Sequence, residues 1–431
     1  MAGTGATMTP MTSLPPGYRT VAVPLDRKSE FLAVDHLAFA FEPDEATSAI
    51  VPDSLEWDRC AGVERPDGTL GAVHSSYDFD LPVPGGEVPC SGLTFVGVRP
   101  DERRRGLLSA MIDFHFRRSL ERGEPVSALF AMEAAIYGRF GYGSASDSAR
   151  LTVPRGARLR DVPGSETLTV RIDTIDPDRH ADLVHAVHVA AGAGRPGWVT
   201  RTTEALRRGR VVDPPAGGGG GEPLRIVTVH DEAGDPRAYA TLRRKENHTA
   251  AGPRFPVTIR EAVAVDAAAA HRLWSFLLDL DLTSEVTTGL LATDDHLVSL
   301  LVDLRGATPR LVDNVWVRLL DLPVALAARR YSAPVDVVLE VTDARLPDNA
   351  GRWRLTTLDE GADGWAAEVT RTDDEPDLRV DVRELGAVYL GARSLAAYGR
   401  ADLVTELTPG TLRPTSAAFA WPVAPVCSWI F

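Results

Sequence analysis

The sequence predicts an α/β (α+β) chain of three domains, each combining a mixed β-sheet with covering helices. The 431 residues are too many for one ordinary hydrophobic core, which indicates two or three domains. Short runs of β-branched and aromatic residues alternate with segments of helical period in three successive groups. The composition, 44% hydrophobic and 25% charged, is that of a folded globular protein.

The first predicted domain covers residues 18–153 and follows a flexible extension over residues 1–17. Strands are predicted at Val21–Val23 and Leu70–Tyr77, with a helix over Ser29–Phe41 between them. The first residues carry neither a basic segment nor an apolar one, so we expect no signal peptide.

A strand, an arginine–glycine turn and a helix follow one another in this domain. Leu93–Val98 is a predicted strand, and a helix is predicted to begin after Gly106. Helix N-termini attract anions, whereas the cations of Arg103–Arg105 oppose the dipole there. The turn therefore favours a bound anion such as pyrophosphate, and a solvated charge cluster is the alternative. Gly97 inside the strand indicates a bulge or a close approach that opens backbone groups to a ligand.

A tyrosine-bearing turn, Ile136–Gly143, follows the next predicted strand. Beside a bound ligand, the phenol of Tyr137 is a candidate proton donor. The alternative is an aromatic cluster that only packs the turn, which is the interpretation we favour for Tyr142.

The last residues, Ala418–Phe431, are unusually apolar for a terminal segment. Burying such a segment also buries the α-carboxylate of Phe431. A carboxylate in a dry cleft has a raised pKa and is a candidate base near neutrality. The alternative is a tail that completes the core of the third domain.

Together these motifs resemble the acetyl-CoA site of the GNAT acetyltransferases, and more narrowly the Eis (enhanced intracellular survival) family. The likeness is strongest over Leu93–Gly143 and weaker through Glu261–Trp274 and Val315–Ala333. It implies that Tyr137 is the general acid and that the carboxylate of Phe431 is the general base. The residues implied to bind acetyl-CoA are Val96, Gly97 and Val98 in the strand, Arg104, Arg105, Gly106, Leu107, Leu108 and Ser109 in the turn, and Met132 and Glu133.

Two residues depart from the pattern that this resemblance sets. Leu108 stands where GNAT enzymes generally have a small residue, although the Eis branch tolerates leucine. Met132 replaces an expected small or hydroxyl residue.

The resemblance implies an acetyl-CoA-dependent N-acetyltransferase that transfers the acetyl group directly, without a covalent enzyme intermediate and without a metal. It also implies a homo-oligomer, a hexamer in this family. The expected acceptor is a small cationic amine of the aminoglycoside or polyamine kind, with protein lysine as an alternative. Glu42, Asp78 and Asp80 are candidate carboxylates for the acceptor, and solvated surface roles are the alternative for each. A different class of function is a lipid or hydrophobic-ligand carrier with a vestigial GNAT domain.

The second domain, predicted over residues 154–309, repeats the element order of the first as a degenerate GNAT-like unit. It begins with a strand at Thr169–Ile172 and a helix over Asp176–Ala193, and ends with a helix over Asp266–Leu280. A proline- and glycine-rich loop, Pro214–Gly221, interrupts it. No Arg-Arg-x-Gly turn stands at the matching place, so we expect no second CoA site.

The third domain, predicted over residues 310–431, resembles a sterol-carrier-like α+β domain. Asn314–Arg318 leads into a helix over Asp321–Arg330, and four strands and two helices follow. The resemblance is architectural and gives no evidence of a bound sterol.

Charge and cysteine content limit the partners and the compartment. The net charge of −14 argues against nucleic acid and anionic membranes, and it suits cationic substrates. The cysteines Cys60, Cys90 and Cys427 are odd in number and far apart, which indicates reduced thiols in a cytoplasmic protein. His185 and His188 lack a third ligand, so we predict surface or packing roles and no metal site.

Overall fold

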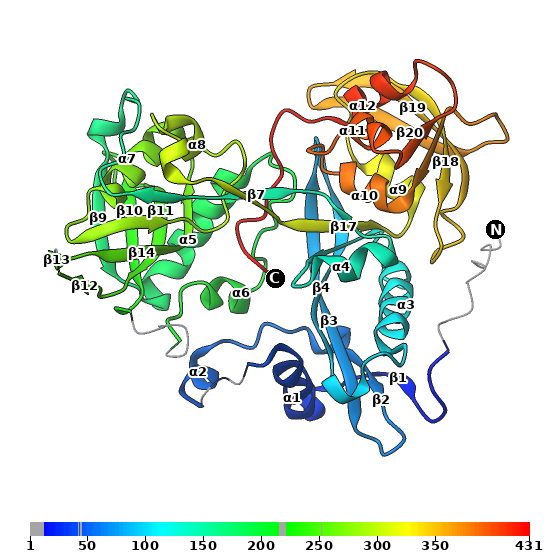
Figure 1. Cartoon of the computed structure of the whole chain (residues 1–431), viewed down its shortest axis with the longest axis horizontal. Helices are drawn as coiled ribbons and strands as arrows, with labels where there is room; N and C mark the ends of the chain where they lie inside the picture. The colour runs from blue at the N-terminus through cyan, green and yellow to red at the C-terminus, as the bar shows by residue number, and fades with distance from the viewer. Residues whose placement is uncertain (1–12, 42, 44, 215–220, 251) are drawn as a thin grey trace.

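The computed structural model describes residues 13–41, 43, 45–214, 221–250 and 252–431, which form three units, each built on its own sheet (Figure 1). Most of the predicted N-terminal extension, the candidate carboxylate Glu42 and most of the glycine-rich loop lie outside the described residues. No helix of the described part is long and apolar enough to cross a membrane.

The first unit contains a seven-stranded sheet in the order β1-β2-β3-β4-β5-β17-β6. Its long central hairpin joins β3 to β4, because the strand predicted to end at Tyr77 continues to Val83. The strands are β1 (Arg19–Ala22), β2 (Ala61–Glu64), β3 (Leu70–Val83), β4 (Gly86–Val98), β5 (Val126–Phe130), β6 (Gly143–Ser144) and β17 (Val315–Leu319). The helices are α1 (Lys28–Phe39), α2 (Glu45–Ile50), α3 (Leu107–Glu121) and α4 (Ala134–Tyr137).

Helices α1 and α3 cover opposite faces of this sheet. Successive residues of β4 point to opposite faces, as strand geometry requires. Phe95 packs with the α1 residue Phe31, whereas Val96 packs with the α3 residues Leu107 and Met111. Any opening between the strands of the sheet therefore connects the α1 side with the α3 side.

The strands β4 and β5 separate after a short parallel contact. Only Cys90–Gly92 pairs with β5, and the rest of β4 extends away from it. Two residues of β4, Phe95 and Val96, face the single residue His74 of β3, and Phe95 has a φ of +52°. The bulge expected at Gly97 thus lies two residues earlier. Gly97 is the site of a close approach instead, because a Cβ there would lie 3.2 Å from the Cβ of Ala38 on α1.

The second unit has a six-stranded sheet in the order β8-β15-β14-β11-β10-β9. Its strands are β8 (Thr152–Pro154), β9 (Thr169–Thr174), β10 (Arg225–His230), β11 (Pro236–Arg244), β14 (Phe255–Ala264) and β15 (Thr283–Thr287). The main helices, α5 (Pro177–Gly192) and α7 (Ala267–Leu278), occupy the two ranges predicted to be helical, and α6 (Glu204–Gly209) and α8 (His296–Leu300) accompany them. Asp266 caps α7 by accepting a hydrogen bond from the backbone N–H of Ala269.

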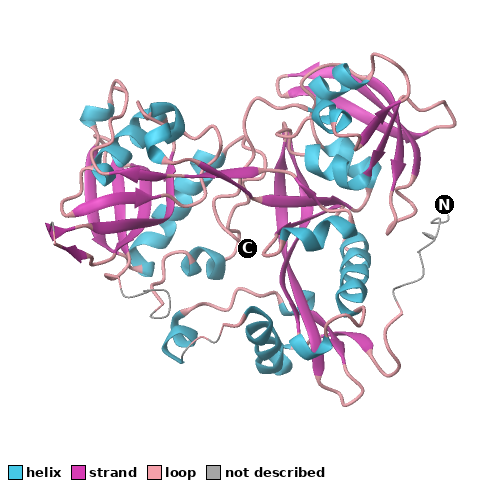
Figure 2. Cartoon of the chain, viewed as in Figure 1, coloured by secondary structure: helices cyan, strands magenta, loops and turns pink. Residues whose placement is uncertain are grey.

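The third unit has a five-stranded sheet in the order β20-β19-β18-β21-β22, with its helices gathered beside the sheet (Figure 2). The strands are β18 (Asp336–Thr342), β19 (Gly351–Gly361), β20 (Gly364–Arg371), β21 (Leu378–Asp381) and β22 (Val404–Glu406). The helices are α9 (Leu322–Ala328), α10 (Val382–Val388), α11 (Leu395–Arg400) and α12 (Leu412–Phe419).

Two strands that follow the boundary predicted at residue 310 pair with segments of the predicted first domain. β16 (Arg310–Asp313) pairs with β7 (Asp147–Arg150), and β17 lies between β5 and β6. Local sequence pattern marks where strands occur but carries no signal for partners so distant in the chain. The sheet of the first unit therefore crosses the boundary predicted at residue 310.

Candidate active site

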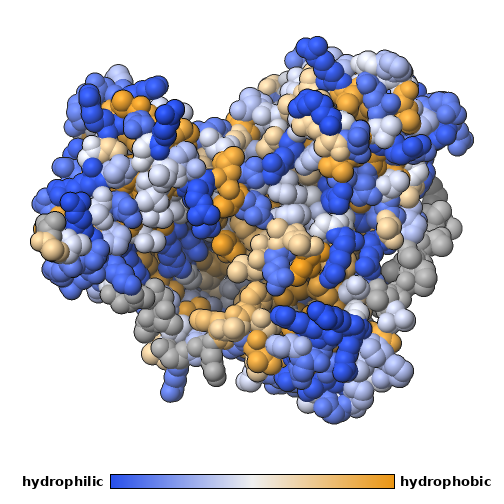
Figure 3. All heavy atoms as spheres, viewed as in Figure 1, coloured by the Kyte–Doolittle hydropathy of each residue, from blue (hydrophilic) through white to orange (hydrophobic). Residues whose placement is uncertain are grey.

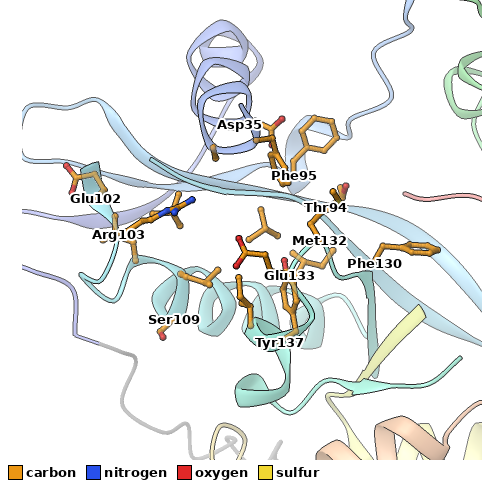
Figure 4. Close-up of a pocket in the computed structure, with 18 of the residues that line it drawn as sticks. Asp35, Thr94, Phe95, Glu102, Arg103, Ser109, Phe130, Met132, Glu133 and Tyr137 are labelled. Carbon is orange, nitrogen blue, oxygen red and sulfur yellow. The ribbon is translucent and has the colours of Figure 1, made fainter. Parts of the chain in front are cut away.

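A cavity of about 1020 Å³ opens where β4 and β5 separate (Figure 4). Its walls include Asp35 and Phe95 from the α1 side of the sheet, and Leu107 and Leu108 from the α3 side. In the space-filling view, hydrophobic residues gather around a hollow at the centre of the molecule (Figure 3). The cavity thus joins the two faces of the sheet, so two ligands can meet in it from opposite sides.

Most of the site residues predicted from the sequence line this cavity. They are Val96, Val98, Arg104, Gly106, Leu107, Leu108, Ser109, Met132, Glu133, Tyr137 and Phe431. Two predicted residues do not line it: Gly97 faces α1, and Arg105 hydrogen-bonds to the hydroxyl of Tyr18 (2.9 Å) and lies 3.3 Å from a carboxylate oxygen of Glu102.

The arginine turn presents Arg103 and Arg104 to the cavity at the start of α3. Arg104 and Gly106 have φ values of +65° and +80°, which fold the chain tightly before the helix. Neither Arg103 nor Arg104 has an acidic partner among the residues that the structure describes. Arg103 was predicted as part of the anion-binding turn but not among the residues implied to bind acetyl-CoA, because three adjacent arginines look alike until the turn fixes which of them face the cavity.

The phenol of Tyr137 points from α4 towards β4 in Figure 4. The side chain is 9% exposed, and its hydroxyl has no hydrogen-bond partner within the described residues. Burial, with a smaller contribution from Glu133, raises the pKa of Tyr137 to about 12, so the phenol carries its proton at neutral pH. Tyr142 is fully buried and bonded to the hydroxyl of Ser127 (2.8 Å), which fits the packing role predicted for it.

The ring of Phe431 lies at the point where the two strands part. Its centroid is 5.0 Å from that of Phe79 and 5.2 Å from that of Phe130. It also faces Gly92, the last residue of β4 that pairs with β5, because a Cβ at Gly92 would lie 3.4 Å from the Phe431 ring. The tail therefore brings its last residue into the same cavity as Tyr137.

The tail before Phe431 is held by buried polar contacts rather than by the core of the third unit alone. The side-chain amide of Asn314 bonds both the N–H (2.8 Å) and the carbonyl (3.0 Å) of Cys427. The hydroxyl of Ser428 donates to Glu261 (2.9 Å), and the indole N–H of Trp429 donates to the carbonyl of Val199 (2.8 Å). Residues of the first and second units thus fix the path of the tail.

Glu261 is the centre of this anchor. It forms an ion pair with Arg201, and Tyr239 donates a 2.9 Å hydrogen bond to its other oxygen. Burial alone would raise the pKa of Glu261, but the charges of Arg201 and Arg210 hold it at about 2. The carboxylate that accepts the Ser428 hydrogen bond is therefore ionised at neutral pH.

Two of the acidic residues predicted for the acceptor, Asp78 and Asp80, are not on the cavity wall. Asp78 and Asp80 are both exposed, and Asp78 lies 3.1 Å from the guanidinium of Arg59. The wall instead contains Asp35, which sequence reasoning missed. A signal was present, since Asp35 stands on the apolar face of its helix, four residues after Phe31 and three before Ala38.

No group of three or more potential metal ligands lies together within the described residues. Of the two roles expected for His188, the structure shows packing: the residue is buried, its ring lies 4.8 Å from that of Trp198, and it bonds the hydroxyl of Ser428 (3.0 Å).

Comparison with known proteins decides the family. Residues 22–145 and 197–319 each match a family described as an acetyltransferase (GNAT) domain, and residues 322–428 match a sterol carrier protein domain. The N-acetyltransferase Eis of Mycobacterium tuberculosis is 34% identical over 350 residues, which are 80% of this chain and 81% of that protein. The chain belongs to the Eis family of GNAT N-acetyltransferases.

Other relatives of this Eis-family enzyme agree. An uncharacterized N-acetyltransferase of Streptomyces avermitilis is 40% identical over 376 residues, 86% of this chain and 88% of that protein. The crystal structure of Eis1 from Mycobacterium abscessus superposes with a TM-score of 0.78 at 30% identity, covering 96% of this chain and all of Eis1. A GNAT structure from Anabaena variabilis, with a TM-score of 0.79 at 19% identity, shares the fold.

These matches confirm the predicted fold class, two GNAT domains followed by a sterol-carrier-like domain, and the predicted N-acetyltransferase activity. GNAT acetyltransferases use acetyl-CoA, so the cosubstrate class follows from the family.

Proposed function

We propose that this enzyme transfers the acetyl group of acetyl-CoA directly to an amine of a small cationic acceptor. In this proposal Tyr137 is the general acid and the α-carboxylate of Phe431 is the general base. The observation that carries it is the meeting of both residues in one cavity, at the gap between β4 and β5.

The residues of the α3 side fit the polyanionic part of acetyl-CoA. The first backbone N–H groups of the 15-residue helix α3 have no partner within the helix, and the residues that carry them line the cavity together with Arg103 and Arg104. Val96 and Val98 lie on the part of β4 that no strand pairs on the β5 side, so their backbone groups are available to the amide arm. Bound there, acetyl-CoA supplies the activated acetyl thioester.

Tyr137 is suited to protonate the departing sulfur. Its hydroxyl has no competing partner among the described residues, and its raised pKa keeps it protonated, so it is free to donate to the sulfur of CoA. Negative charge develops on that sulfur as the C–S bond breaks, and Tyr137 stabilises it first by a hydrogen bond and then by its proton.

The carboxylate of Phe431 is suited to accept the proton of the attacking amine. The aromatic rings of Phe79, Phe130 and Trp429 surround the Phe431 ring and exclude water from that side. The Asn314 and Ser428 contacts fix the tail just before Phe431. The carboxylate is therefore already positioned, and little conformational entropy is lost when it accepts the proton.

The acceptor class and the assembly complete the proposal. A net charge of −14 favours cationic acceptors such as polyamines, aminoglycosides or lysine side chains. The family resemblance supports a homohexamer. A cytoplasmic location is supported by the three free, buried thiols. The GNAT match of the unit that carries the cavity favours the transferase over the hydrophobic-ligand carrier.

The test is release of CoA from acetyl-CoA, followed with a thiol reagent, across a panel of aminoglycosides, polyamines and lysine peptides. Acceptor-dependent release with a small amine supports the proposal. Release with lysine peptides only would contradict the small-molecule acceptor. Absence of acetyl-CoA binding would favour the carrier.

A further inference from the structure

We propose that Asp35 binds a second, protonated nitrogen of the acceptor, so that this enzyme selects diamines over monoamines. This inference rests on the proposed function and names the class of acceptor that the same cavity takes.

Asp35 is a buried carboxylate on the cavity wall. It lies on α1, on the side of β4 opposite Tyr137, with the ring of Phe95 beside it (Figure 4). The residue is 9% exposed, and its Oδ1 atom is fully enclosed without any hydrogen-bond partner. A buried carboxylate without a partner is strongly disfavoured, and a bound cation removes that cost.

No cation of the described protein occupies this place. Within the described residues Asp35 forms no ion pair, and burial raises its pKa. The other charged side chains of the wall are Glu102, Arg103, Arg104, Glu133 and Arg139. The charged or titratable neighbours on α1 itself are Lys28, Glu30 and His36, of which Lys28 pairs with Asp53.

The reaction determines which nitrogen Asp35 binds. An amine attacks the thioester only as the neutral base, so the reacting nitrogen cannot also be the cation paired with Asp35. The carboxylate therefore recognises another nitrogen of the same molecule. Since the cavity opens on both faces of the sheet, the acceptor enters from the α1 side and presents its neutral amine at the gap, opposite acetyl-CoA.

The experiment compares straight-chain diaminoalkanes with monoamines of equal length in the CoA-release assay. For the wild type we expect kcat/KM to be about 10- to 100-fold higher for the best diamine, the range of a charge-assisted hydrogen bond in a partly buried site. Asp35→Asn should reduce that ratio to about one, chiefly through KM for the diamine. Asp80→Asn, which removes an exposed carboxylate of β3 outside the cavity, should keep the wild-type ratio.

A wild-type ratio near one, or an Asp35→Asn enzyme with the wild-type ratio, would overturn the inference. If no amine is acetylated although acetyl-CoA binds, the proposed function fails but the role of Asp35 is still testable. Calorimetric titration of a diamine then measures whether Asp35 binds it. Diamine binding to the CoA-loaded wild type that weakens at least about tenfold in Asp35→Asn supports the site, and equal affinity rejects it.

Discussion

Ser428 and Glu261 lie 167 positions apart in the chain, yet the serine hydroxyl donates a 2.9 Å hydrogen bond to the buried glutamate. The bond joins the tail to the second unit, which has no arginine turn of its own. That unit contributes to the site by holding the tail, because its ionised Glu261 and the partner Arg201 form a fixed buried anchor.

Ser428→Ala should lower turnover without unfolding the enzyme. Loss of a hydrogen bond to a charged, buried partner costs about 1.5–3 kcal/mol and frees the residues that place Phe431. We expect kcat to fall about tenfold and the Kd of acetyl-CoA, measured by calorimetry, to change less than about twofold. Ser332→Ala is the matched control, since that hydroxyl bonds the carbonyl of Ala417 in the third unit (2.7 Å) and should leave kcat unchanged. Equal kcat in the two variants would contradict the anchoring role.

One glycine added after Phe431 tests the terminal base. The addition moves the carboxylate by about 3.8 Å but leaves the ring contacts with Phe79 and Phe130 in place. Removing a general base costs about 10²–10⁴-fold, so we expect kcat to fall at least about 100-fold. The Kd of acetyl-CoA should stay unchanged. An extended enzyme with full turnover would remove the carboxylate from the mechanism.

Tyr137→Phe should separate chemistry from binding. The hydroxyl makes no structural hydrogen bond among the described residues, so its loss should reduce kcat about 100-fold with little change in acetyl-CoA affinity or thermal stability. Since the pKa of Tyr137 is about 12, the wild-type kcat should show no alkaline decline from this group below about pH 10.

Tyr142→Phe supplies the comparison for Tyr137→Phe. It removes the bond to Ser127 and should cost about 1 kcal/mol of unfolding free energy with kcat nearly unchanged. An equal loss of kcat in both variants, or a parallel loss of acetyl-CoA binding in Tyr137→Phe, would argue against the acid role.

Local pattern predicted the elements of this fold better than their partners. The helix after Gly106 and the strand before Pro100 follow from side-chain period and turn chemistry, and both occur in the structure. The insertion of β17 beside β5, and the contact of Ser428 with Glu261, depend on pairing between distant segments, for which one sequence carries no local signal.

Within the site, the sequence predicted which types of residue occur but not which way their side chains point. The sequence indicated an arginine turn, but only the structure shows that Arg103 lines the cavity while Arg105 contacts Tyr18 and Glu102. Asp35 was missed although it stands on the apolar face of its helix, because the sequence alone does not show that this face meets a cavity.

The three arginines of the turn should differ in their effect on CoA binding. Arg103→Ala and Arg104→Ala each remove a cation that lines the cavity, and we expect the Kd of CoA to rise about tenfold, the effect of one charge-assisted contact. Arg105→Ala should raise it less than about twofold, because that side chain bonds Tyr18 instead. Calorimetric titration measures all three, with high salt reducing the first two effects. A largest loss in Arg105→Ala would refute this arrangement of the turn.

Asp35→Asn should change stability in the direction opposite to that of an ordinary buried substitution. Burial raises the pKa of Asp35 from 3.8 to about 6, so the folded state holds this proton more tightly than the unfolded state. The unfolding free energy contributed by this group therefore falls as the pH rises from about 4 to about 6, and it stays low above that range. At about pH 8 the asparagine variant should be more stable than the wild type by about 1–2 kcal/mol, less than the full shift corresponds to because water in the cavity screens part of the charge. Near pH 4 the two proteins should be equally stable.

Urea denaturation of both proteins at each pH gives the difference in unfolding free energy, in which the titration of other groups cancels. A variant that is less stable at pH 8 would mean that Asp35 has a structural partner, and it would remove the physical reason for expecting a cation there.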